Sequence, residues 1–283
     1  MFSKFLCSKY SHLVVPLSAS TNIPEPPPPS PSIWDVMDYR PLSNSTNEIR
    51  ILSITSAKDP QSPISCELQH VPLGVESNYV ALSYTWGPQR KTTPVICHGR
   101  KVFITPSLDA GLRELRSRGH LRVWADALCI NQEDLEERSL QVRRMAAIYR
   151  SAAIVIASLG GDDPKQCIQV KELLKATKYL MASAPERFDK RRFIVSNLYY
   201  HLNIGKLHWN SLYNLFTCEY WRRVWIVQEL AMAINLEIIW GHQDLYLEDL
   251  KDALNICKFM ENDTTATIPP LGDAKACSTA FNF

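Results

Sequence analysis

Residues 79–84 of this chain read Tyr-Val-Ala-Leu-Ser-Tyr, a short and mostly apolar run that predicts a strand buried on both faces. A second such run, Ala-Ala-Ile-Val-Ile-Ala-Ser-Leu, occupies residues 152–159. Between them the patterns predict a helix, a strand at 121–128 and another helix. This alternation is typical of parallel strands joined by right-handed crossovers, with helices on both faces. The sequence therefore predicts an α/β fold with a mostly parallel, flavodoxin-like sheet.

Further elements extend this unit on both sides. Thr105 and Pro106 predict the start of the first helix, and Gly119 its C-terminal cap. The long interval 160–220 predicts a helical insertion, in which residues 185–208 match no clear pattern. The other predicted elements are strands at 48–55 and 64–71, an N-terminal β-hairpin elaboration at 95–105, helices at 165–182, 220–233 and 247–260, and a strand at 236–240.

Composition narrows the class of protein. The chain has 283 residues, 46% of them apolar, and a net charge of +2. The apolar content and seven Trp exclude a disordered protein, and the balanced charge predicts neither a nucleic-acid nor a membrane partner. No apolar run approaches the about 18 residues of a membrane span, so a cytoplasmic protein is expected. We predict a disordered Pro-rich arm at 1–47, one domain at 48–262 and a flexible tail at 263–283.

The sequence lacks the standard motifs of metal sites, cofactor sites and enzyme active sites. The eight cysteines are widely and irregularly spaced without a CxxC motif, which predicts reduced thiols and no metal site. The seven histidines are isolated from one another. P-loop, GxGxxG, GxSxG and HExxH motifs do not occur, so no cofactor is predicted.

Three segments nevertheless combine polar and aromatic residues. In the first, the buried strand runs into Ser83, Tyr84, Trp86 and Gly87. Ligands of open α/β sheets bind at the carboxyl ends of strands, so these residues are candidates for a binding site. The alternative is a strand end packed by Trp86, with Gly87-Pro88 as its turn.

The second segment covers residues 123–132 and places Asp126 inside an apolar strand. A buried carboxylate must be paired or hydrogen-bonded. Asp126 is therefore predicted either to pair with Arg138 or Arg143 or to belong to a site.

The residues that follow Asp126 predict the start of a helix. Asn131, next to Gln132, is the predicted N-cap, and the helix N-terminus it opens is also suited to an anion. Glu136 and Glu137 are interpreted as a solvated face of this helix.

The third segment, residues 220–231, is predicted to be an aromatic helix. Trp221, Trp225 and Gln228 share one helical face by their spacing, and Glu229 lies one turn beyond Trp225. Such a stripe is usually core. A Glu beside it in a partly apolar cleft would have a raised pKa, which is typical of functional carboxylates.

Together and in this order, the segments resemble the three blocks of the fungal heterokaryon-incompatibility (HET) domain. The blocks read ALSYxWG, then WxDALCINQ followed by ERxxQVxxMxxIY, then RVWxxQE, and they stand here at 81–87, 124–149 and 223–229. The resemblance spans about residues 79–241, with Ala125 where the family more often has a bulky residue. It implies a role in allorecognition, because HET-domain proteins trigger programmed cell death when genetically different hyphae fuse.

The order of elements also resembles TIR domains, in which a Glu of a WCxxEL helix supports cleavage of NAD. Trp225 and Glu229 match that spacing, with Ile226 in place of Cys. This resemblance implies an NAD glycohydrolase with NAD as substrate and Glu229 as the catalytic residue. It makes substrate-binding candidates of Ser83, Tyr84, Trp86, Gly87, Asp126, Asn131, Gln132, Arg223, Trp225 and Gln228, with stacking on Trp86 or Trp225 and the pyrophosphate on Arg223.

Two alternatives to the enzyme stay open. One is a domain that acts without chemistry of its own, by self-association or by binding other incompatibility proteins, and the other is a truncated, inactive member. An enzyme requires Glu229 to point into a cleft near residues 83–86, whereas a Glu229 buried in an ion pair favours a non-catalytic role.

Overall fold

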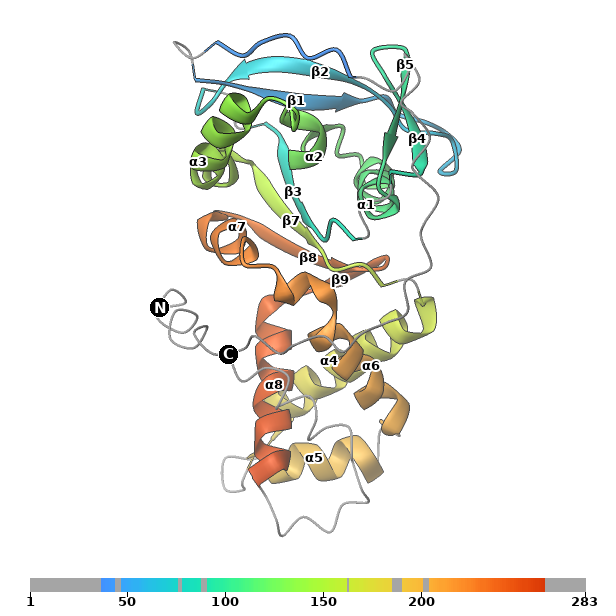
Figure 1. The fold of residues 1–283 in the computed structure, drawn as a ribbon. Helices are drawn as coiled ribbons and strands as arrows, with labels where there is room; N and C mark the ends of the chain where they lie inside the picture. The colour runs from blue at the N-terminus through green and yellow to red at the C-terminus, as the bar shows by residue number, and fades with distance from the viewer. Residues whose placement is uncertain are drawn as a thin grey trace, which may run out of the picture.

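The computed structural model of the chain describes residues 37–43, 47–75, 78–87, 91–161, 163–184, 190–200 and 204–262. Figure 1 shows a sheet with its covering helices above and a group of helices below. The hydrophobic core follows the same division, with one cluster around the N-terminal strands and another among the lower helices and the last strands. The predicted α/β class is confirmed.

The described strands form one nine-stranded sheet in the order β5-β4-β2-β1-β6-β3-β7-β8-β9. The four strands β6, β3, β7 and β8 are mutually parallel, whereas the wings pair antiparallel except at β2 and β4. The sheet is therefore mixed rather than mostly parallel as predicted, because hairpins extend both wings. Its strands are β1 (Glu48–Ile54), β2 (Ser65–Pro72), β3 (Val80–Tyr84), β4 (Thr93–Cys97), β5 (Arg100–Ile104), β6 (Arg122–Trp124), β7 (Ile154–Ser158), β8 (Leu236–Trp240) and β9 (Gln243–Leu245).

The parallel strands are wound in opposite directions from β3. The chain leaves β3, passes through α1 (Pro106–Ser117) and enters β6 on one side of β3. It then passes through α3 (Leu135–Ser151) and enters β7 on the other side. The carboxyl end of β3 is thus a topological switch point, the place where ligands of open α/β sheets bind.

Strand β3 is covered on both faces, as its apolar sequence predicts. Leu82 lies against α1, where a Cβ on Gly111 would come within 3.0 Å of the Leu82 side chain. Ser83 points to the opposite face because side chains alternate along a strand, and it meets α7 (Ile226–Met232). Each face of β3 therefore depends on a different helix.

The predicted start and end of α1 are confirmed. The Thr105 side chain accepts a hydrogen bond from the Leu108 N–H, and Pro106 stands in the first turn. Gly119 follows the C-cap with φ +82°, a left-handed conformation that suits glycine. The hairpin predicted at 95–105 is also confirmed, because β4 and β5 pair antiparallel, with His98 and Gly99 at positive φ in the turn between them.

Two predictions in the second segment are wrong. The strand at 121–128 ends at Trp124, and Asp126 lies in the short helix α2 (Asp126–Cys129) instead of in a strand. Helix α3 is capped by Asp134, whose side chain accepts from two backbone N–H groups of the first turn, and not by Asn131. Asp134, directly before the helix, provides the cap that the sequence pattern assigned to Asn131.

The predicted continuous helix at 220–233 is also wrong. A 3-10 helix, Glu219–Arg222, ends before Arg223, which is extended with φ −77° and ψ 126°, and α7 begins only at Ile226. Trp221 and Trp225 therefore do not share one helical face. This break is what turns the Arg223 side chain toward α7.

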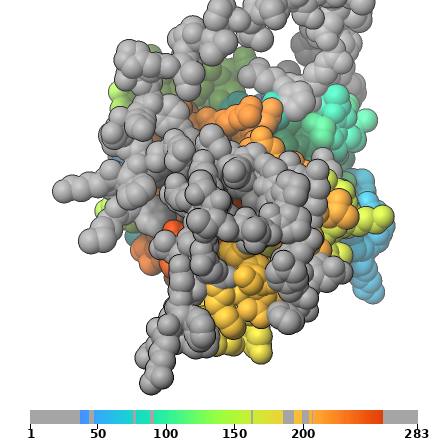
Figure 2. All heavy atoms as spheres, turned by 90° about the horizontal axis from the view of Figure 1, so that it is seen from below, coloured from blue at the N-terminus to red at the C-terminus, as the bar shows by residue number. Residues whose placement is uncertain are grey.

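The lower helices form the predicted helical insertion together with the C-terminal helix. Their bounds are α4 (Pro164–Ser183), α5 (Lys190–Tyr200), α6 (Lys206–Thr217) and α8 (Leu247–Asn262). Helices α5 and α6 and strand β9 were not predicted from the sequence as individual elements. Figure 2 views this end from below, where yellow and gold atoms of the α4–α6 region are visible.

The predicted arm at 1–47 and tail at 263–283 lie mostly outside the described residues. Of the arm, residues 37–43 and 47 are described, and the Tyr39 hydroxyl donates to the Leu128 carbonyl. Within the described part of the chain, no helix is long and apolar enough to cross a membrane. Among the described cysteines, Cys66, Cys97, Cys129 and Cys218 are not joined in disulfides.

Candidate functional site

A buried polar cluster lies at the carboxyl end of β3, at the switch point. The Ser83 hydroxyl donates a hydrogen bond to the Glu229 carboxylate from α7. Ser83 Oγ also lies 2.6 Å from the Tyr220 hydroxyl of the 3-10 helix. All three side chains are fully buried. The first and third sequence segments therefore meet through Ser83.

Glu229 is also the buried partner of an ion pair. Arg223 Nη2 lies 3.1 Å from Glu229 Oε1, and the exposed fractions of the two side chains are 18% and 0%. Burial raises the pKa of Glu229 above its usual range, although Arg223 and the Ser83 hydrogen bond act to lower it. The carboxylate has an opposite charge beside it but no surface open to solvent.

Asp126 brings the second segment into the same cluster. Its Oδ2 accepts a hydrogen bond from Trp86 Nε1 at 2.9 Å, and its Oδ1 accepts one from the Ala127 N–H at 2.8 Å. Burial raises the pKa of Asp126, opposed by the Trp86 hydrogen bond and the positive charge of Arg223. Arg223 is therefore close enough to act on both buried carboxylates.

The cluster contains one guanidinium for two carboxylates. Tyr84 and Tyr149 lie against it, and burial raises the pKa of both phenols well above the ordinary value. The Tyr84 hydroxyl is buried without a hydrogen bond of ordinary geometry in the described structure, although Asp126 is near enough to raise its pKa. Such a site is able to hold a proton on a carboxyl group at a pH where exposed carboxyls are ionised.

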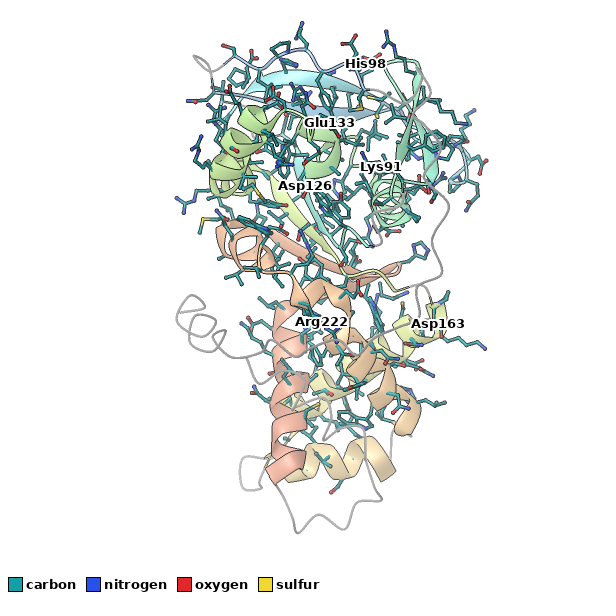
Figure 3. The ribbon with its side chains drawn as sticks, in the orientation of Figure 1. Lys91, His98, Asp126, Glu133, Asp163 and Arg222 are labelled. Atoms are coloured by element: carbon teal, nitrogen blue, oxygen red, sulfur yellow. The ribbon has the colours of Figure 1, made fainter. Side chains whose placement is uncertain are left out.

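The loop after β3 joins the cluster to the start of α1. Ser107 Oγ donates to the Trp86 carbonyl at 2.9 Å, and the Trp86 side chain is 36% exposed. Gly87 follows with φ +64°. Figure 3 shows Asp126 in the sheet part of the molecule and Arg222 near the border with the lower helices. The loop after β3 therefore connects the cluster, through Trp86, to the start of α1.

Replacing Gly87 with alanine is expected to cost about 1–2 kcal/mol of the free energy of unfolding, because an L-residue is strained in the left-handed region. A Cβ there would also stand 3.4 Å from Ser107 Oγ. The control is Gly205→Ala, at a position without positive φ and with open space around it. Urea unfolding followed by circular dichroism measures both. Equal losses for the two variants would contradict the strain argument.

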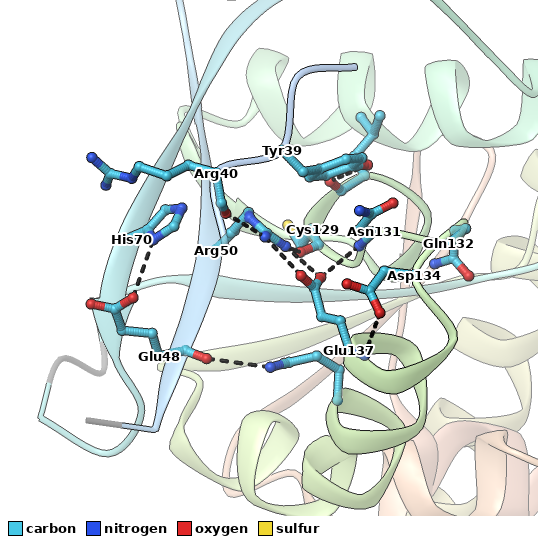
Figure 4. A network of polar contacts seen from close by, with 12 residues as sticks. Tyr39, Arg40, Glu48, Arg50, His70, Cys129, Asn131, Gln132, Asp134 and Glu137 are labelled. Atoms are coloured by element: carbon cyan, nitrogen blue, oxygen red, sulfur yellow. Dashed lines mark hydrogen bonds and ion pairs between the residues drawn. The ribbon is translucent and has the colours of Figure 1, made fainter. Parts of the chain in front are cut away.

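The second segment is held in place by a buried arginine on β1, shown in Figure 4. Arg50 forms two hydrogen bonds with the Glu137 carboxylate, of 2.6 Å and 2.9 Å. Arg50 also donates to the Cys129 carbonyl at the end of α2 and to the Arg40 carbonyl. Its guanidinium stands 4.8 Å from the centre of the Tyr39 ring. Residues 37–43, β1, α2 and α3 are thus tied together at one side chain.

Asn131 and Gln132 belong to this region rather than to the carboxylate cluster. The Asn131 N–H donates to Glu137, and its side chain accepts from the Glu133 N–H. Gln132 Nε2 donates to the Asp126 carbonyl at 2.9 Å, so it supports the backbone of α2. The interpretation of Glu137 as a solvated residue is wrong, because its side chain is only 10% exposed beside Arg50.

The structure therefore brings together part of the predicted site. Trp225 is 50% exposed, and its side chain is not among those that join the cluster through the contacts described above. The predicted partners of Asp126, Arg138 and Arg143, are exposed on α3 and were wrong. The predicted residues that meet in the cluster are Ser83, Tyr84, Trp86, Asp126, Arg223 and Glu229.

The sequence alone did not identify some of the residues that line this site. Tyr149 closes the second block, and Tyr220 stands just before the third, so their positions beside the blocks were a usable signal. Arg50 had no such signal, because it lies in a predicted strand far from all three blocks. Among the described residues, no group of three or more His, Cys, Asp or Glu is placed to hold a metal ion.

Comparison with known proteins identifies the family of the region that carries these residues. The family model described as heterokaryon incompatibility protein (HET) matches residues 79–229, which is more than half of the chain. A curated relative, heterokaryon incompatibility protein 6, OR allele, from Neurospora crassa, is 36% identical over 133 residues. That alignment covers 42% of this chain and 20% of the relative, so the chain spans only a small part of the relative's length. No solved structure gives a significant match. The matched region contains all three blocks, and the chain belongs to the heterokaryon incompatibility protein (HET) family.

Proposed function

We propose that this chain is an effector of heterokaryon incompatibility that triggers programmed cell death after unlike hyphae fuse. Its family and its relative support a role in incompatibility. One observation of the structure supports a common function for the matched region. Residues from its three blocks converge on a single buried cluster, in which Ser83, Asp126 and Glu229 each come from a different block.

We further propose that the domain acts in the cytoplasm as a signalling module, through other incompatibility proteins or through copies of itself. The state of Glu229 supports this choice over an enzyme. Its carboxylate is fully buried and paired with Arg223, and a group without exposed surface does not touch a substrate in this conformation. The cluster then serves to hold α7 against the carboxyl end of β3.

Cleavage of NAD is the second candidate function, and a different observation favours it. Asp126 and Glu229 both have raised pKa values and both lie at the switch point of the parallel strands. Buried carboxyls with raised pKa values at such positions are typical of active sites. This function requires Arg223 to move away from Glu229, so that the carboxylate reaches the ribose of the substrate.

A time course of NAD in cells that express the full chain separates the two candidates. The signalling module predicts loss of viability while NAD stays constant until membranes fail. The enzyme predicts that NAD falls before viability and that Glu229→Gln, which keeps the shape of the side chain, abolishes the fall. Arg222→Ala is the control, because it changes an exposed residue beside the cluster. Gln228→Glu is unsuitable as a control, because it adds a negative charge.

The abundance and melting temperature of each variant must be measured beside viability. A stable Glu229→Gln protein that no longer depletes NAD supports the enzyme and overturns the non-catalytic module. Normal growth at high levels of the folded wild-type chain overturns the effector proposal itself. That outcome favours the alternative that this chain is a truncated, inactive member of the family.

A further inference from the structure

Two cysteines face each other across neighbouring strands on the N-terminal wing of the sheet. Cys66 on β2 and Cys97 on β4 are direct partners in the parallel register. Both side chains are 2% exposed, and both belong to the same hydrophobic cluster. The two thiols are close enough for each to shift the pKa of the other. The wide spacing of these residues in the sequence concealed the pair.

The geometry meets the main requirement for a disulfide. Neighbouring strands lie about 4.8 Å apart, within the range of about 4.4–6.8 Å between the Cα atoms of disulfide-bonded cysteines. Register partners also direct their side chains to the same face of the sheet. We propose that Cys66 and Cys97 are an oxidation site, at which a hydroperoxide converts the two thiols into a disulfide between β2 and β4. This inference is independent of the proposed function.

The reaction balances with one molecule of hydroperoxide. The Cys97 sulfur attacks one peroxide oxygen, the O–O bond breaks, and hydrogen peroxide leaves as water while Cys97 becomes a sulfenic acid. The Cys66 sulfur then attacks the Cys97 sulfur, the S–O bond breaks, and a second water leaves with the thiol proton. Two thiols are oxidised and one peroxide is reduced.

The environment assigns different roles to the two thiols. The hydrogen bond from Cys66 lowers the pKa of Cys97, which favours the thiolate that attacks the peroxide. The same hydrogen bond, together with burial, raises the pKa of Cys66. In the proposed order, Cys97 attacks the peroxide first and Cys66 acts second, as the resolving thiol. Cys129 lies close enough to raise the pKa of Cys66 further, which makes it the competing partner.

The position of the pair in the sheet gives peroxide a route to it. Strand β4 pairs with β2 over two residue pairs only, and β5 is the outermost strand of the wing. Short pairing at the edge of a sheet opens locally at a lower free energy than the centre. Movement of the β4–β5 hairpin is therefore sufficient to admit a molecule as small as hydrogen peroxide.

The disulfide would link the β4–β5 hairpin covalently to β2. The hairpin lies in the chain between β3 and α1, and the loop that carries Trp86 precedes it. Closing the chain between residues 66 and 97 restricts the unfolded state, so the oxidised protein is expected to melt several degrees higher than the reduced protein. Reduction with dithiothreitol should reverse this increase.

Peptide mapping of the full chain tests the proposal. The reduced protein is treated with hydrogen peroxide at a dose that fully oxidises free glutathione, and remaining thiols are alkylated in denaturant before digestion. We expect a linked peptide pair that contains Cys66 and Cys97. Cys97→Ser should abolish the link and the rise in melting temperature. Cys167→Ser, which removes a buried cysteine from α4 in the other hydrophobic cluster, should change neither.

Two results would overturn the proposal. The first is complete alkylation of Cys66 and Cys97 after peroxide treatment of the folded wild-type protein. The second is a link between Cys66 and Cys129 in place of Cys97. Because melting of the untreated variants is measured separately, a Cys97→Ser protein that fails to fold is recognised, and Cys66→Ser then serves as the second variant.

Discussion

Replacing Arg50 with alanine is expected to lower the free energy of unfolding by about 3–5 kcal/mol, because removal of one partner leaves the other charge buried and unpaired. Arg50 is 1% exposed, and Glu137 is 10% exposed beside it. The substitution also removes the donors to the Cys129 and Arg40 carbonyls. The loss should therefore exceed that of any exposed arginine.

Urea unfolding of matched variants measures this effect. Arg143→Ala is the control, because Arg143 lies exposed on α3, and it should change the stability by less than about 0.5 kcal/mol. Glu137→Ala should approach the loss of Arg50→Ala. The double variant Arg50→Met with Glu137→Leu should be more stable than either single variant, because no unpaired charge remains. A small effect of Arg50→Ala would show that this ion pair is not buried in solution.

Replacing Arg223 with alanine is expected to cost about 3 kcal/mol near neutral pH, because Glu229 loses its opposite charge in a buried site. The effect should depend on pH. Burial already raises the pKa of Glu229, and Arg223 acts to lower it, so its removal raises this pKa further. The same argument applies to Asp126.

The sign of the pH dependence follows from linkage. A carboxyl whose pKa is raised by folding contributes stability below its unfolded pKa, and that contribution is lost as the pH rises through the folded pKa. Arg223→Ala should thus lose stability more steeply than the wild type as the pH rises above the unfolded pKa of Glu, which is about 4.3.

The free energy of unfolding, measured as a function of pH for each variant, tests this prediction. Arg222→Ala, an exposed neighbour, should follow the wild-type profile. The double variant Arg223→Ala with Glu229→Gln should recover part of the stability near neutral pH, because the buried group is then neutral. A profile of Arg223→Ala parallel to that of the wild type would contradict the role of Arg223 as the partner of Glu229.

Local patterns predicted the elements where one signal dominates. The apolar run at Val80–Tyr84 and the cap formed by Thr105 and Pro106 determine β3 and the start of α1 whatever surrounds them. The prediction failed at Arg223, where helical periodicity continues but the structure has an extended residue. There the ion pair with Glu229 competes with helix geometry, and periodicity contains no information about such a contact.

By itself, the sequence determined the α/β class, the three blocks and the family to which they belong. It also placed Ser83, Asp126 and Glu229 among the candidates, because polar residues in apolar surroundings stand out locally. Only the tertiary structure decided which charges meet. The strand order and the turn of the chain between helices decide which residues pair. They bring together Arg223 and Glu229, Arg50 and Glu137, and Cys66 and Cys97. Electrostatic and covalent partners act over a few ångströms in space, and a distance of that kind is set by the fold and not by separation along the chain.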